Sequence, residues 1–96
     1  MAENQTTAAP ETAAEPINGR VTRIQGSVID VEFPVGHLPD IYNALTVDAK
    51  TLAGEIHLVL EVESQLPGNL VRAVAMSSTD GLIRGLDAVD TGHPIM

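Results

Sequence analysis

Three histidines, His37, His57 and His93, are the side chains of this sequence best suited to move a proton near neutral pH or to bind a transition metal. They fall on different expected elements, and no two of them have the H-x-x-x-H spacing of a metal-binding helix. The chain has no cysteine, which excludes a thiolate nucleophile and a cysteine-based zinc site. His57 shares the polar side of an expected strand with Glu55 and Glu61, so we interpret it as a solvent-exposed histidine on which these acids have no particular effect. The histidines therefore indicate no metal site.

The sharpest local match to a catalytic motif is Asp90-Thr91-Gly92. Asp-Thr-Gly is the active-site triplet of aspartic proteases, in which two such aspartates share a proton. A homodimeric protease with one triplet per chain is therefore the alternative function for this sequence. The triplet comes late, however, and His93-Pro94 follows it, which leaves no residues for a flap hairpin. We favour a turn, in which Asp90 accepts backbone hydrogen bonds and Gly92 supplies a positive φ.

Other catalytic patterns are missing from the sequence. It contains neither G-x-x-x-x-G-K-[ST] nor G-x-G-x-x-G, and its only lysine, Lys50, is not in a glycine-rich loop. No serine has the G-x-S-x-G context of a nucleophile elbow. The pairs Asp30/Glu32 and Glu61/Glu63 have strand spacing, which places both members of a pair on one face, and we interpret them as solvated surface. We expect no catalytic, cofactor-binding or metal-binding residue in these 96 positions.

The charge balance disfavours two classes of partner. Asp and Glu number 13 against 5 Lys and Arg, for a net charge of −8. Affinity for nucleic acid and for anionic membranes comes largely from Lys and Arg, so neither partner is expected. Phe33 and Tyr42 are the only aromatic residues, too few for a base-stacking surface.

The longest apolar run is 73–76, too short to cross a membrane, and Glu3 stands where a signal peptide carries positive charge. The chain is therefore predicted to be cytosolic or cytosol-facing.

The chain divides into a tail and one folded domain. Residues 1–18 begin with Ala, Thr, Pro and Glu and contain no large apolar residue between Met1 and Ile17. Such a segment cannot bury enough surface to offset its ordering entropy, so we predict a disordered acidic tail. Residues 19–96 contain short β-rich runs cut by glycine and proline, and we assign them to the domain.

Alternation of apolar and polar residues predicts the strands of this domain. The predicted strands are 19–25, 27–33, 44–49, 55–63, 70–76 and a last one that begins at His93. The clearest is 55–63, in which Ile56, Leu58, Leu60 and Val62 share one face. Small residues on one face of 70–76, namely Val71, Ala73 and Ala75, suit a crowded barrel interior. In 27–33, Ile29, Val31 and Phe33 face one way, and Val28, Asp30 and Glu32 the other. We predict an all-β fold, a small closed six-stranded antiparallel barrel.

The order of the motifs adds a family resemblance. In sequence they are 19–26 (GRVTRIQG), 28–34 (VIDVEFP), 38–45 (LPDIYNAL), 58–62 (LVLEV), 69–72 (NLVR), 75–76 (AM), 78–85 (STDGLIRG) and 90–95 (DTGHPI). Together they resemble the N-terminal domain of the β subunit of F-type ATP synthase. The stretches 38–45 and 78–85 favour β over the α subunit and over the flagellar and secretion ATPases. The acidic extension before Gly19 is similar to the variable N-terminus of bacterial members.

The resemblance implies a six-stranded barrel that joins the barrels of neighbouring subunits in a ring of three α and three β subunits. It implies a parent subunit that makes or hydrolyses Mg-ATP, coupled to proton transport, in a following domain that lies beyond these residues. The expected partners are α subunits. The expected location is the cytoplasmic face of the cell membrane, without insertion, and the chain alone is expected to be a monomer. Pro67-Gly68-Asn69 is a predicted turn, and Pro67 departs from the family, which more often has Gly or an acid there. Asp90-Thr91-Gly92 becomes a turn leading into the strand that leaves the barrel.

Overall fold

The computed structural model describes residues 17–52 and 54–95, so the tail predicted for 1–18 lies mostly outside the described residues. The described strands are β2 (Ile17–Gln25), β3 (Val28–Glu32), β4 (Asn43–Thr51), β5 (Gly54–Leu66), β6 (Leu70–Ala75) and β7 (Asp87–Pro94). Strand β2 begins at Ile17 rather than at Gly19, because Ile17 and Asn18 pair with Asp90 and Val89 of β7.

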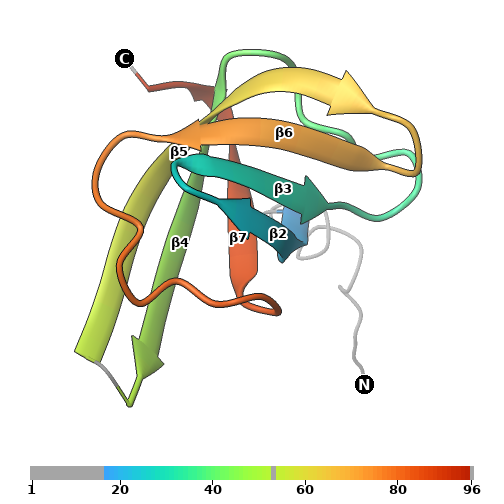
Figure 1. Cartoon of the computed structure of the whole chain (residues 1–96). Coiled ribbons are helices and arrows are strands. Elements are labelled where there is room, and N and C mark those ends of the chain that lie inside the picture. Colours follow the sequence, from blue (N-terminus) through green and yellow to red (C-terminus); the bar gives the residue numbers. More distant parts are fainter. Residues whose placement is uncertain (1–16, 53, 96) are drawn as a thin grey trace, which may run out of the picture.

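The six strands form a closed barrel in the order β2-β3-β6-β5-β4-β7, as Figure 1 shows. Every pairing is antiparallel. Three pairings join strands that follow one another in the chain, whereas β3–β6, β4–β7 and β2–β7 bring distant segments together and close the sheet. Closure leaves no continuous sheet edge, which removes the template for uncontrolled strand addition. The predicted all-β, six-stranded antiparallel barrel is confirmed.

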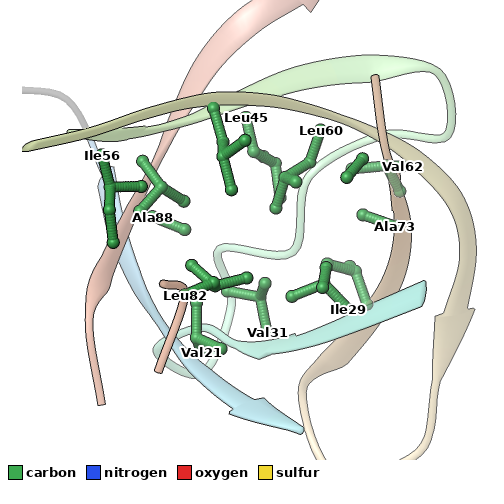
Figure 2. Close-up of a cluster of buried hydrophobic side chains, with 14 of the residues drawn as sticks. Val21, Ile29, Val31, Leu45, Ile56, Leu60, Val62, Ala73, Leu82 and Ala88 are labelled. Carbon is green, nitrogen blue, oxygen red and sulfur yellow. The ribbon is translucent and has the colours of Figure 1, made fainter. Parts of the chain in front are cut away.

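The core is made of the inward-facing residues of all six strands, which point toward one another in Figure 2. The predicted inner face of β5 is buried, with Leu60 and Val62 at 0% exposure and Ile56 and Leu58 at 6%. The small residues of β6 are buried too, including Ala73. Gly19 is needed for close packing, since a Cβ there would lie 2.7 Å from Cζ of the buried Phe33.

The loop from 76 to 86 closes one end of the barrel. Val21 and the loop exchange two backbone hydrogen bonds, from Val21 N to the Leu86 carbonyl (2.9 Å) and from Gly85 N to the Val21 carbonyl (2.7 Å). Leu82 is 8% exposed and joins the core, where Figure 2 shows it beside Val21. Leu82 alone therefore plugs this end of the barrel, since the next residue, Ile83, is exposed.

The β4–β5 hairpin extends away from the rest of the barrel in Figure 1. β7 pairs with β4 only as far along as Thr46, and β6 pairs with β5 only from Leu60 onward, whereas β4 and β5 stay paired to Thr51 and Gly54. The residues between those points, 47–51 and 54–59, form what we call the arm. Among the described residues, no other strand pairs with either outer edge of the arm, and only its last residue, Val59, accepts a backbone hydrogen bond from Met76.

The last strand differs from the prediction. It spans Asp87–Pro94 instead of beginning at His93, so Asp90-Thr91-Gly92 lies within a strand and is not a turn. The sequence pattern concealed this because β7 alternates poorly: of its residues only Ala88 is fully buried. The turn predicted at 67–69 is confirmed, with φ of 84° at Gly68 and 63° at Asn69.

Candidate functional site

The Asp-Thr-Gly triplet is bonded into the sheet. The Asp90 Oδ1 atom accepts a hydrogen bond from Asn43 Nδ2 (3.2 Å) and another from the Gly92 backbone N–H (2.9 Å). Thr91 Oγ1 lies 2.8 Å from the Ala44 carbonyl oxygen across the β4–β7 pair. The local chemistry predicted for a turn is present, including a φ of 82° at Gly92, but here it shapes a strand irregularity between β4 and β7. The Asp90 carboxylate thus has a positioning task within the barrel.

His57 is part of an ionic cluster on the outer face of the arm. It pairs in register with Asp48 of β4, and its Nδ1 atom lies 2.7 Å from Asp48 Oδ1. Its Nε2 atom lies 3.3 Å from Glu55 Oε1. Hydrogen bonds first to Asp48 and then to Glu55 raise the pKa of His57 above its usual value of 6.5.

The interpretation of His57 as unaffected by nearby acids is therefore wrong. Asp48 was not predicted as a partner, because it approaches His57 only through cross-strand pairing. The signal that could have found it is the position of the β4–β5 turn, since that turn fixes which residues face each other. The two ring nitrogens of His57 point to different carboxylates, so the cluster does not converge on one point in its cavity of about 240 Å³.

Asp30 differs most from its predicted environment. It lies on the outward side of β3, yet its side chain is only 8% exposed. Arg72 covers it with two hydrogen bonds, from Nε to Oδ1 (3.0 Å) and from Nη2 to Oδ2 (3.2 Å). Both bonds raise the pKa of Arg72. The interpretation of Asp30/Glu32 as a solvated pair is wrong for Asp30, because flanking strands place large side chains over its carboxylate.

Of the other candidate residues, Glu61 and Glu63 interact with each other, whereas His37 and His93 lie on separate segments. Glu61 and Glu63 are on β5, where a hydrogen bond with Glu61 is the main cause of a raised pKa at Glu63. His37 is exposed in the loop after Pro34 and donates its backbone N–H to the Pro34 carbonyl. His93 is exposed near the end of β7. In the described ranges 17–52 and 54–95, no three His, Asp or Glu side chains gather as a metal site would require.

The same described ranges contain no helix with the length and apolar character needed to cross a membrane. The backbone there is entirely strand, turn and loop.

The closed six-stranded barrel corresponds to a known family of domains. The model of the beta-barrel domain of the ATP synthase alpha/beta family matches residues 21–92. The chain belongs to this family. The match covers all of β3, β4, β5 and β6, together with the loop that carries Leu82. The barrel domain of the ATP synthase alpha/beta family has a structural role and no catalytic activity alone. Family membership implies assembly in an ATP synthase hexamer.

For a member of this family, the outer face of the barrel is the surface available for assembly. Outside the arm, the closed sheet offers no edge strand, so a partner there must contact outward side chains and loops. Large apolar side chains are exposed there, among them Tyr42 (61%), Ile41 (45%) and Met76 (49%). The candidate functional site of this chain is therefore a protein contact surface.

Proposed function

We propose that this chain is the N-terminal barrel of a β-type subunit of a bacterial F-type ATP synthase. In this role it packs beside the barrels of α subunits in the ring of three α and three β subunits. The ring lies at the cytoplasmic face of the membrane. The observation that carries the proposal is the family match over residues 21–92, joined to the β-like stretches at 38–45 and 78–85.

Both β-like stretches have defined places in the barrel, which supports their use as markers. In 78–85, Leu82 is the buried plug and Gly85 donates to the Val21 carbonyl. In 38–45, Pro39 is buried and its carbonyl accepts a hydrogen bond from Gln65 Nε2 (2.8 Å). Tyr42 in that stretch has a φ of 77°, and its ring is exposed. The stretch thus anchors one residue and presents another to a neighbour.

The proposal assigns ATP and Mg²⁺ to a different domain of the parent subunit. A triphosphate site needs a glycine-rich loop of inward N–H groups, a lysine, and a hydroxyl with a carboxylate for the metal. Residues 1–96 do not contain that motif. The barrel therefore contributes to the synthase by holding neighbouring subunits together while other domains move.

A binding comparison with the two subunit types tests the proposal. The chain is immobilised and titrated separately with purified α subunit and purified β subunit of a bacterial F-type ATP synthase. A β-type barrel binds α and shows no saturable binding to β. Preference for β would mean that the chain is an α-type barrel, and binding to neither subunit would contradict an assembly role.

A further inference from the structure

Five residues on the outer face of strands β2, β3 and β6 surround a cavity of about 360 Å³, and we call them the arginine face. They are Arg23, Gln25, Val28, Asp30 and Arg72. The barrel register sets them in rows, since Arg23 of β2 lies opposite Asp30 of β3, which in turn lies opposite Arg72 of β6. One aspartate is thus flanked in register by two arginines.

This row is positive on a strongly acidic chain. The net charge of the whole sequence is −8. Arg20 lies opposite Glu32, and Lys50 Nζ lies 3.9 Å from Glu55, so those cations each face a carboxylate. Asp30 is also the acid opposite Arg23, but its carboxylate is already bonded to Arg72. An acidic group that approaches the barrel is therefore attracted here more than at those other cations.

Both guanidinium groups have donors left for a ligand. A guanidinium carries five N–H groups in a planar fork that suits carboxylates. Arg72 uses Nε and Nη2 on Asp30, and Arg23 uses Nη2 on the Gln25 side chain. Because Asp30 is 8% exposed and held by Arg72, the pair is fixed before any ligand arrives. Arg23 is exposed and is the guanidinium that a ligand meets first.

Apolar side chains continue the same face and indicate a protein ligand. Val28 is 36% exposed and lines the cavity, with Val74 of β6 opposite it. Next along the outside are Met76 (49%) and Val59 (37%), joined by a hydrogen bond from Met76 N to the Val59 carbonyl. Arginine and methionine beside exposed apolar area are the composition of protein interfaces. A free anion would gain nothing from contact with Val28 and Met76.

We propose that the arginine face receives a carboxylate side chain, Asp or Glu, from the barrel of the neighbouring α subunit, with Val28 and Met76 packing beside it. This inference rests on the proposed function and names the surface and the recognition chemistry. The carboxylate completes a four-charge row with Arg23, Asp30 and Arg72, in which each negative group lies next to a positive one.

Affinity for the α subunit, measured at low and high salt, tests the proposal with three variants. We expect Arg23→Gln to weaken binding about fivefold to tenfold at low ionic strength, with a smaller loss at high salt. An exposed charge at the edge of an interface attracts its partner over a distance, and dissolved salt screens that attraction. Arg23→Glu should weaken it further. Arg20→Gln is the matched control on the same strand and should change affinity less than about twofold. Thermal unfolding of each variant verifies that the barrel is intact.

Three outcomes overturn the proposal. Equal effects of Arg23→Gln and Arg20→Gln would remove the special role of the arginine face. Unchanged α affinity in Arg23→Gln, together with saturable amide shifts at Arg23 and Arg72 on titration with inorganic phosphate, would make the face a free-anion site. In both of these cases the proposed function still stands, provided that the unchanged chain binds the α subunit. Absence of α binding in the unchanged chain would instead overturn the proposed function, and the inference with it.

Discussion

Two ionic clusters lie on the outside of this barrel, and they differ in how much their neighbours cover them. Asp30 and Arg72 lie on β3 and β6, which are paired with strands on both sides, and the Asp30 side chain is 8% exposed. His57, Asp48 and Glu55 lie on the arm, where the side chains of His57 and Asp48 are each 67% exposed. Both clusters join adjacent strands in register. Their sequence patterns look alike, since each has an acid on an outward strand position.

The difference in cover decides what each cluster contributes. A buried carboxylate depends on its partner, because an uncompensated charge away from water is costly. An exposed pair is screened by water and ions, so it contributes little to stability. The covered pair is therefore expected to hold the barrel together, whereas the arm cluster is expected to respond to pH. The following changes test that contrast, from the largest expected effect to the smallest.

Leu58→Ala should have the largest effect. Leu58 is 6% exposed on the inner side of the arm, directly after the exposed His57. Its truncation should cost about 2–5 kcal/mol of unfolding free energy, from lost transfer energy and a cavity. Glu61→Ala, on the outer side of the same strand, is the control and should stay within about ±0.5 kcal/mol. Denaturant unfolding measures both, and the reverse order of effects would mean that the assigned faces of β5 are wrong.

Arg72→Ala should come next, because it leaves the Asp30 carboxylate covered and unpaired. We expect a loss of unfolding free energy smaller than that of Leu58→Ala, because water reaches the arginine and screens the pair. The Arg72 side chain is 42% exposed. Replacing Asp30 as well, with Asn, should restore part of the stability, since no buried charge is then left alone. Equal stability of the single and double variants by denaturant unfolding would argue that Asp30 is hydrated.

The arm cluster should produce a pH effect without a large stability effect. The pKa of His57 is raised in the folded state, so its contribution is complete below about pH 6.5, the unfolded value, and is lost as pH rises through the higher folded pKa. Asp48→Asn should lower that pKa more than Glu55→Gln does, because the hydrogen bond to Asp48 is the largest cause. An NMR titration of the His57 ring gives both values. A larger effect from Glu55→Gln would reverse the assigned order of the two partners.

Mg-ATP should have the smallest effect, namely none. The sequence contains no phosphate-binding loop, and its net charge of −8 repels anions. Titration of Mg-ATP into the labelled chain should give no saturable amide shift below about millimolar concentration. Without a glycine-rich loop and its lysine, the barrel has no group that would bind the phosphates tightly. Saturation in the micromolar range would reveal a nucleotide site on the barrel.

Local sequence predicted those features that depend on neighbours in the chain. The alternation in 55–63 predicted the inner face of β5, because successive strand residues point to opposite sides of a sheet. Pro67-Gly68-Asn69 predicted its turn, because glycine and asparagine tolerate positive φ. Asp90 was predicted to accept a backbone hydrogen bond, and it does so from the Gly92 N–H two residues away, although within a strand and not in the predicted turn.

Features that depend on another strand could not be predicted in the same way. The strand around Asp90 was missed because its alternation is weak and its pairing partners, Ile17 and Leu45, are distant in sequence. Asp48 was missed as the partner of His57 because the sequence between the two strands lacks the Asn-Gly or Asp-Gly signal that marks a register.

The sequence by itself determined the fold class, the inner faces of the strands and the family, because alternation, turn residues and motif order are written along the chain. Only the tertiary structure decided which charged residues are covered. Asp30 and Asp48 are both acids on outward strand positions, yet Arg72 covers Asp30, whereas the Asp48 side chain stays 67% exposed beside His57. The physical reason is that barrel closure sets neighbours from distant segments beside each strand, and those neighbours fix the exposure and the pKa values of outward side chains.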